Sequence, residues 1–164
     1  VVFERNENGE SSVTSIGNYA VTNGISLTEI EIPASVETIG DYAFKGCSKI
    51  TGLTFPKTLS LKTTGNGIFS GCTSLESIVI EEGATDLYGI GSCPALKSIT
   101  IPTSVTKIGL SSYDTCDYES IIIAEGNPVY DSREGCNAII ETATNKLLYT
   151  CRTTVIPNRV TFLY

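Results

Sequence analysis

The chain has 164 residues, 41% of them hydrophobic, and a net charge of −7. This length and composition suffice for one domain with a sizeable core. The negative charge argues against binding nucleic acids through their phosphates, or anionic lipids through their headgroups.

His is absent from the chain, which removes the usual general base for Ser and Cys nucleophiles and the commonest transition-metal ligand. The lack of His leaves open enzymes that use two carboxylates. No run approaches the ~18 apolar residues of a membrane helix. We therefore expect no membrane insertion by this segment, no cofactor and no metal, and the absence of His argues against enzymatic activity.

A sequence motif recurs about every 23 residues. Residues 32–40 return at 101–109 as Ile-Pro-x-Ser-Val-x-x-Ile-Gly, and residues 44–50 return at 69–75 as Phe-x-Gly-Cys-x-x followed by Ile or Leu. A period of this length is typical of a solenoid, in which each unit buries its apolar side only against its neighbours.

The units follow one another without an obvious linker. Because the last unit stops midway and the chain starts without Met, we expect residues 1–164 to form a single solenoid domain that is a piece of a longer array. Any signal or anchor segment would then lie outside this sequence. The units run over 12–32, 33–55, 56–80, 81–101 and 102–123, a longer variant unit covers about 124–156, and a seventh begins at Pro157 and stops at Tyr164.

Each unit contains a strand pattern with large apolar residues at its first, fourth and sixth positions, which should face inward. A Pro ends this strand, a second short strand follows, and a Gly then allows a tight turn. A short helical turn, such as 41–44, leads to the next unit. The first strands are expected at 27–32, 50–55, 75–80, 96–101 and 118–123, and the second strands at 13–16, 36–39 and 105–108.

Three stretches depart from the repeat: an insertion at 59–65, an acidic turn at 81–87 and a changed turn at 111–116. We interpret them as altered loops, which solenoid scaffolds tolerate. The aromatic residues of the inter-strand turns should fill the core with one ring per turn, at 19–20, 42–44 and 68–69.

The repeated elements Ile-Pro-x-Ser-Val-x-x-Ile-Gly, Tyr-Ala-Phe-x-Gly-Cys and Leu-x-x-Ile-x-Ile resemble the BspA-like class of leucine-rich repeats from about Ser12 to Tyr164. The variant unit is similar to that family over 127–145. The resemblance implies a β-rich solenoid, a leucine-rich-repeat right-handed superhelix with two short strands and a helical turn per unit, plus one β-hairpin. It also implies a cell-surface or secreted protein of anaerobic, often host-associated bacteria that acts in adhesion or protein binding, with no catalytic residues to carry over.

Four cysteines, Cys47, Cys72, Cys93 and Cys116, recur at close to one per unit. Metal sites usually contain Cys pairs two to four residues apart, and no such pair exists here. The repeat position favours small buried fillers instead. A disulfide between adjacent units would require Cα atoms within about 7 Å of each other.

Residues 138–142 and 146–150 predict the two strands of a hairpin around 143–145. If Glu141 pairs with Lys146, the same register sets Cys136 directly opposite Cys151, and opposed residues meet the distance requirement of a disulfide. We hypothesise a cross-strand disulfide between these two cysteines, with two buried free thiols as the alternative.

Stacking the units aligns the exposed positions of the first strands into one face, which is often the binding surface of a repeat protein. A solvated sheet of Thr, Ser and Glu would give a similar pattern. Val79 and Ile122 fit a solvated sheet poorly and could form a small contact patch. The candidate ligand-binding positions are Thr28, Glu29, Glu31, Thr51, Thr54, Glu76, Ser77, Val79, Lys97, Ser98, Thr100, Glu119, Ser120 and Ile122.

Two acidic clusters are interpreted as solvated loop charge, because neither has the spacing of a calcium-binding loop and nothing marks a substrate pocket beside them. They consist of Glu81, Glu82 and Asp86, and of Asp114, Asp117 and Glu119.

The sequence therefore predicts a non-enzymatic adhesion or protein-binding module whose partner is a host or microbial surface protein. A structural spacer that carries another domain is the alternative. Carbohydrate recognition is a third hypothesis, which would require aromatic platforms and a close carboxylate pair. Exposed apolar area at 161–164 would favour end-to-end self-association.

Overall fold

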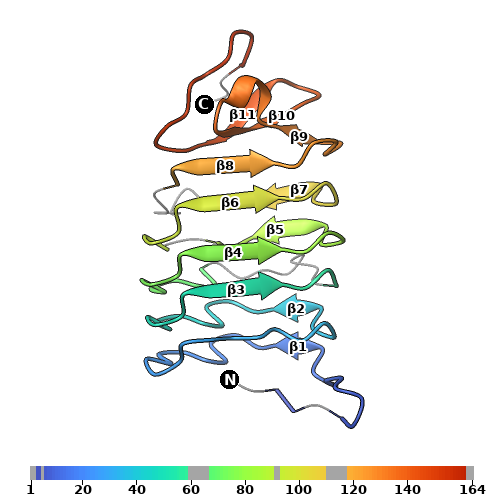
Figure 1. The fold of residues 1–164 in the computed structure, drawn as a ribbon, viewed down its shortest axis with the longest axis vertical. Coiled ribbons are helices and arrows are strands. Elements are labelled where there is room, and N and C mark those ends of the chain that lie inside the picture. The colour runs from blue at the N-terminus through green and yellow to red at the C-terminus, as the bar shows by residue number, and fades with distance from the viewer. Residues whose placement is uncertain (1–2, 5, 59–66, 91–92, 110–117, 162–164) are drawn as a thin grey trace.

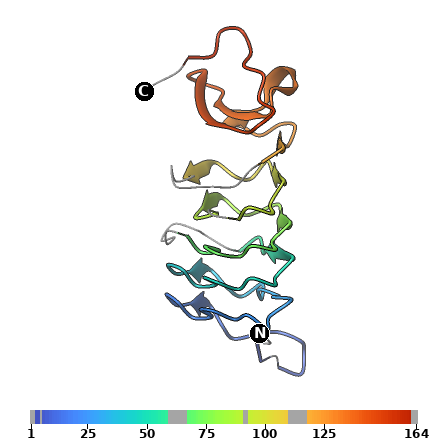
Figure 2. The same cartoon turned by 90° about the vertical axis from the view of Figure 1, so that its left-hand side faces the viewer.

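The computed structural model of the chain describes residues 3–4, 6–58, 67–90, 93–109 and 118–161. The backbone turns stack along the long axis of the molecule, with the two termini at opposite ends (Figure 1). A view turned by 90° shows strands along two sides of this stack (Figure 2). This arrangement confirms the predicted β-rich solenoid.

The first column of strands lies where the Leu-x-x-Ile-x-Ile pattern predicts it. Strand β3 pairs in parallel with β4, with Leu53 opposite Ile78, and β6 pairs in parallel with β8, with Ile99 opposite Ile121. Strands β4 and β6 are in contact but belong to separate sheets. Buried and exposed residues alternate along each strand, because successive side chains point to opposite faces. The strands are β3 (Gly52–Phe55), β4 (Ser77–Ile80), β6 (Ser98–Ile101) and β8 (Ser120–Ile123).

The second column also consists of short parallel strands, and β1 pairs with β2 while β5 pairs with β7. The acidic stretch 81–87, expected to be an altered loop, runs into strand β5, so the unit keeps its second strand there. The altered part is the turn before β5, where Glu82 and Ala84 form an isolated bridge. The strands are β1 (Ser15–Ile16), β2 (Thr38–Ile39), β5 (Asp86–Tyr88) and β7 (Lys107–Gly109).

The inter-strand turns hydrogen-bond from unit to unit through their backbones. Val21 N–H donates to Ala43 O at 2.7 Å, and Phe44 N–H donates to Ile68 O at 3.0 Å. The expected helical turn is wrong at 41–44, where the backbone forms hydrogen-bonded turns and Tyr42 has a φ of 54°. A residue in this left-handed region interrupts a helix. Among the described residues the one helical element is the short 3-10 turn η2 (Arg133–Gly135).

Phenylalanine rings join successive units in the core. Phe44 and Phe69, at the same position of adjacent units, stack with centroids 5.6 Å apart, and Phe55 meets the Phe69 ring edge-on at 5.8 Å. All three side chains are buried. Because each ring contacts the next unit, the apolar core runs continuously through the stack.

Replacing Phe69 by Ala should destabilise the protein by about 3–5 kcal/mol, because it leaves a cavity between two rings. The free energy of unfolding in urea measures this loss. The exposed Thr51→Ala is the control and should stay within about 0.5 kcal/mol of the wild type. A loss below about 1 kcal/mol for Phe69→Ala would contradict the ring-stacked core.

The first unit differs from the prediction in its strand. Residues 27–32 form no sheet pairing, although Ile30 and Ile32 are each 6% exposed and therefore face inward as expected. Within the described residues, β4 is the one sheet partner of β3. The hydrophobic pattern thus fixes the side-chain directions in this unit without a strand ladder.

The variant unit contains the predicted hairpin, formed by β10 (Ala138–Glu141) and β11 (Lys146–Thr150), with β9 (Tyr130–Asp131) on the other side of β10. Glu141 pairs with Lys146 as expected. The register then shifts by one residue between Ile139 and Ile140, which is the signature of a β-bulge.

The predicted register, which brought Cys136 opposite Cys151, is wrong because the bulge shifts the strand pairing by one residue. Cys151 Sγ instead donates to Asn137 O at 3.1 Å, and Cys136 Sγ lies 3.6 Å from Ser132 Oγ. Both cysteines are free thiols in the structure. Cys136 is buried, whereas Cys151 is partly exposed.

We expect six reactive thiols when the protein is denatured without a reductant and titrated with a thiol reagent, since the sequence contains six cysteines. The bulge keeps Cys136 and Cys151 out of the opposed positions that a cross-strand disulfide needs. Four thiols, rising to six after reduction, would contradict this expectation.

The C-terminal end of the chain was expected to expose apolar area at 161–164. Thr161 is exposed, and its backbone forms an isolated β-bridge with Lys146 next to the hairpin turn. The other three residues lie outside the described residues, as do 59–65 of the predicted insertion and 111–116 of the changed turn.

Candidate functional site

The exposed side of the first strand column is named the strand face here, and it consists of the fourteen candidate positions predicted from the sequence. The strand pairing sets Thr54 opposite Val79 and Thr100 opposite Ile122, as the stacked repeats predicted. Lys97 and Ser120 are partly buried, and the other members are exposed. The structure therefore brings the predicted positions onto one surface.

Two apolar side chains interrupt this polar surface. Val79 is 55% exposed on β4 and Ile122 is 49% exposed on β8. Thr100 on β6, the strand between them, is also exposed. A β-branched side chain suits a strand for conformational reasons, but its exposure leaves apolar area in contact with water.

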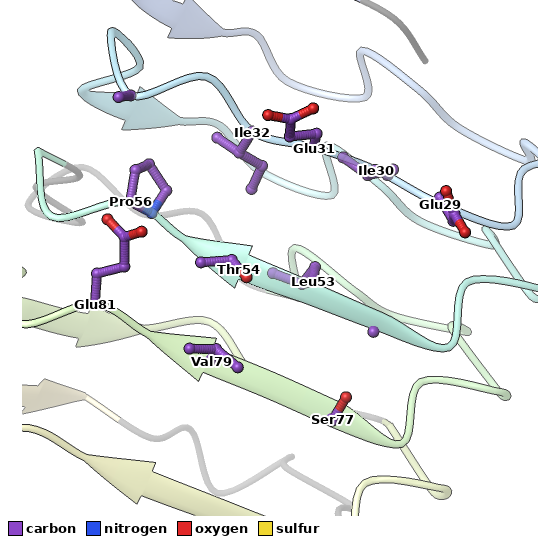
Figure 3. A pocket seen from close by; sticks show the side chains of 12 residues that line it. Glu29, Ile30, Glu31, Ile32, Leu53, Thr54, Pro56, Ser77, Val79 and Glu81 are labelled. Carbon is purple, nitrogen blue, oxygen red and sulfur yellow. The ribbon is translucent and has the colours of Figure 1, made fainter.

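A groove of about 650 Å³ lies at the lower part of the strand face, between the first and third units (Figure 3). The sequence predicted several of its lining residues but not the groove itself. Its walls come from residues 29–34, from β3 and from β4. It is lined by Glu29, Ile30, Glu31, Ile32, Ala34, Gly52, Leu53, Thr54, Pro56, Ser77, Val79 and Glu81.

Gly52 helps to keep the groove open. A Cβ atom at this position would approach Ser77 Oγ to 2.9 Å, which is closer than normal packing allows. The neighbouring units carry Ser at the equivalent strand positions, at Ser77 and Ser98. The missing side chain therefore makes the sheet surface lower at β3 than at β4.

Three carboxylates line the groove, and none of its lining residues is basic. Glu29 and Glu31 belong to the first unit, and Glu81 follows β4 on the far side of β3 (Figure 3). The Glu81 carboxylate accepts a hydrogen bond from the Lys57 backbone N–H at 3.0 Å. This bond orients the carboxylate without removing its charge.

The predicted acidic cluster at 81–86 needs one correction. Asp86 is not solvated: its side chain is 2% exposed on β5, accepts a hydrogen bond from Thr85 Oγ1 and lies 3.8 Å from Lys107 Nζ. Glu82 is exposed as expected and accepts from the hydroxyl of Thr103 at 2.6 Å. This bond lowers the pKa of the Glu82 carboxyl. In the second cluster Glu119 is exposed, while Asp114 and Asp117 lie outside the described residues.

Hydrogen bonds from side chains connect the turns that precede the second strands of successive units, and the sequence did not predict them. Ser35 Oγ donates to Val13 O at 2.7 Å, and Ser104 Oγ donates to Ala84 O at 2.8 Å. Asn127 takes this role in the variant unit, with Nδ2 donating to Pro102 O and Val105 O at 2.9 Å. The signal in the sequence is a hydroxyl residue two positions after Pro in three units, at Ser35, Thr58 and Ser104.

The repeat cysteines have the buried filler role that the sequence predicted. Cys47, Cys72 and Cys93 are fully buried. Each thiol donates to a carbonyl of the preceding unit; for example, Cys47 Sγ lies 3.1 Å from Val21 O and Cys72 Sγ lies 3.2 Å from Phe44 O. Burial raises the pKa of Cys47, and it raises the pKa of Cys72 to about 12. Cys116 lies outside the described residues.

The thiol pKa makes stability depend on pH in the alkaline range. The pKa of Cys72 is raised from 9.0 to about 12 in the folded state, so folding favours the protonated thiol. The contribution of this thiol to the free energy of unfolding is complete below pH 9 and is lost as the pH rises toward 12. Above pH 9 the wild type should lose about 1.4 kcal/mol of unfolding free energy per pH unit more than Cys72→Ala. Urea unfolding of both proteins at several pH values measures the difference, and parallel pH profiles would contradict it.

Two tyrosines of the inter-strand turns form a stacked pair on the surface. The Tyr19 and Tyr42 centroids are 5.2 Å apart, and Lys45 Nζ lies 5.2 Å from the Tyr42 centroid. Tyr19 is 53% exposed, so the expectation that its ring fills the core is wrong. Phe44 and Phe69 do fill the core, as predicted for their turns. Neither tyrosine lines the groove.

Two further properties concern the described part of the chain. No helix among these residues is long and apolar enough to span a bilayer. Its His, Cys, Asp and Glu side chains form no group of three that could hold a metal ion.

The stacked parallel strands with an exposed first column define a leucine-rich-repeat protein. Residues 8–120 match the family described as BspA type leucine rich repeat region (6 copies), and the chain belongs to this family. No curated protein matches the chain.

Solved structures of bacterial leucine-rich-repeat proteins share the fold. A leucine rich cell surface protein from Faecalibacterium prausnitzii A2-165 superposes with a TM-score of 0.72 at 26% identity, over 94% of this chain and 42% of that one. A leucine-rich repeat protein from Bacteroides ovatus superposes with a TM-score of 0.58 at 27% identity, over 68% of this chain and 29% of that one. The pneumococcal vaccine antigen PcpA superposes with a TM-score of 0.67 at 17% identity, over 92% of this chain and 40% of that one. This similarity concerns the fold alone. The chain spans less than half the length of each.

Proposed function

We propose that this chain is a non-enzymatic protein-binding module of a bacterial cell-surface or secreted protein, and that it binds its ligand through the strand face. The observation that carries the proposal is the exposure of Val79 and Ile122 on an otherwise polar sheet. Apolar anchors surrounded by polar groups are the usual composition of a protein-binding surface. A host or microbial surface protein is the proposed partner.

The family supports the non-enzymatic part of the proposal, because leucine-rich-repeat proteins generally act as scaffolds that present a surface. A surface or secreted location is supported by the Faecalibacterium prausnitzii relative, which is described as a cell surface protein. Adhesion is the form of protein binding that this location favours.

Replacing Val79 and Ile122 together by Ser should weaken binding to a protein ligand by about tenfold or more, because two apolar anchors are lost. An array of extracellular-matrix proteins and mucins identifies the ligand, and surface plasmon resonance measures both affinities. The matched control is the double variant Ile25→Ser and Val155→Ser, since these residues are 63% and 73% exposed and lie outside the strand face.

Equal affinity of both double variants and the wild type would contradict binding through the strand face. A blank array would favour the alternative of a structural spacer that presents another domain. Carbohydrate recognition is a second candidate function, favoured by the exposed stack of Tyr19 on Tyr42. A hit on glycans alone that Tyr19→Ala removes would identify that function.

A further inference from the structure

Tyr19 and Tyr42 have a backbone conformation that tyrosine rarely adopts. They lie at the same position of the inter-strand turns in two successive units, and their φ angles are 55° and 54°. The third unit has Gly67 at this position, with a φ of 63°. Because a left-handed backbone is unfavourable for a bulky side chain and accessible to Gly, the turn itself favours Gly here. Two tyrosines at this position indicate a role for their rings.

The core does not require these rings. Neither tyrosine belongs to the apolar core cluster. The turn of the second unit is filled by Ala43 and Phe44, which are fully buried, whereas Tyr19 is 53% exposed in the first unit. The two rings stack on each other outside the core, with an interplanar angle of 19°. Their role is therefore sought at the surface.

One face of the Tyr19 ring is open to solvent. Its other face lies against Tyr42, with ring centroids 5.2 Å apart, and the 53% exposure of Tyr19 leaves the opposite face accessible. Tyr42 in turn contacts the third unit, because a Cβ atom at Gly67 would come within 2.9 Å of Tyr42 Cε1. The stack therefore fixes the orientation of the Tyr19 ring before a ligand binds, which lowers the entropic cost of binding.

The surface around this open ring is polar and uncharged. Residues 11–28 contain no Asp, Glu, Lys or Arg, although these residues make up 18% of the chain. The Asn18 amide is fixed, since its Oδ1 accepts from the Asp41 backbone N–H at 2.8 Å. Its Nδ2 group then remains to donate to a ligand that carries oxygen acceptors. The exposed polar side chains of this turn are Asn18, Thr22, Asn23 and Ser26.

A neutral sugar fits this surface better than other ligands that stack on aromatic rings. Nucleobases bind to aromatic platforms inside positively charged grooves, and residues 11–28 carry no positive charge. Proline-rich peptides bind in grooves between aromatic side chains, whereas Tyr19 and Tyr42 cover each other. A sugar ring has C–H groups on one face, which the negative face of a tyrosine ring attracts, and hydroxyl groups on its rim, which pair with amides and hydroxyls.

We infer that the open face of Tyr19 binds a sugar ring of a neutral glycan, with Tyr42 supporting the platform from behind. Neither tyrosine belongs to the strand face, so this site is separate from the proposed protein-binding surface. The inference rests on the second candidate function, carbohydrate recognition, and names its site and its ligand class. The cation at the stack, Lys45, lies over Tyr42, the covered ring, so the site does not select anionic sugars.

Saturation-transfer NMR and calorimetry with hexasaccharides of β-linked glucose, galactose and mannose test the inference. At least one of them should bind with a Kd of about 1 mM or below, and saturation should reach the C–H protons of one ring face. The affinity should change less than about twofold between about 50 mM and about 500 mM salt, because no ionic contact is involved. A hexasaccharide of galacturonic acid should bind at least about threefold more weakly, since the protein is itself anionic.

Tyr19→Gly should weaken binding of the neutral hexasaccharide by about tenfold or more, because it removes the platform. This variant copies the third unit, where Gly67 has the same left-handed backbone, so the turn keeps its conformation. Tyr19→Phe keeps the ring and should stay within about twofold of the wild type. Tyr42→Ala removes the support alone and should give an intermediate loss of about threefold.

The matched control is Ile25→Ala, since Ile25 is 63% exposed in the same turn and has no ring. It should bind the hexasaccharide as the wild type does. The strand-face variant Val79→Ser and Ile122→Ser should also bind it normally, because the two sites are separate.

No binding by any of the three neutral hexasaccharides, or equal binding by the wild type and Tyr19→Gly, would overturn the inference and leave the strand-face proposal intact. Binding of the galacturonic acid hexasaccharide alone would also overturn it. Loss of the glycan in the strand-face variant as well as in Tyr19→Gly would contradict a separate site. Loss in Tyr19→Gly alone, with Tyr19→Phe and both controls unchanged, would support the inference.

Discussion

Contact between successive units is the interaction on which the rest of this structure depends. A single unit of about 23 residues has too little apolar surface to form a core by itself, so it must bury that surface against its neighbours. Phe44 on Phe69 is one example, and the thiol of Cys72 bonded to Phe44 O is another. Because equivalent residues have to meet in every unit, the same contacts that form the core also align the exposed positions into one face.

This constraint explains why the sequence alone predicts the core and the strand face. The opposition of Thr54 to Val79 and of Thr100 to Ile122 follows from the repeat, since any other register would move buried isoleucines to the surface. The repeated cysteines follow in the same way, because a position that recurs once per unit meets the same environment each time. The BspA-type family assignment rests on the same residues.

Features that depend on one unit alone were not predictable from the repeat. The bulge between Ile139 and Ile140 separates Cys136 from Cys151, and the repeat pattern of the sequence does not predict it. Asp86 is buried although it lies in an acidic stretch, because that stretch still forms the second strand of its unit. The groove is the clearest example, since it requires both a Gly at position 52 and the loss of pairing at 27–32, and only the first of these is visible in the sequence.

The groove lies at one of the places where the strand ladder is interrupted. Ile30 and Ile32 keep the first unit packed on the second, so the core tolerates the interrupted ladder above it. The side chains around the groove therefore determine its chemistry, and they combine three carboxylates with the exposed side chain of Val79.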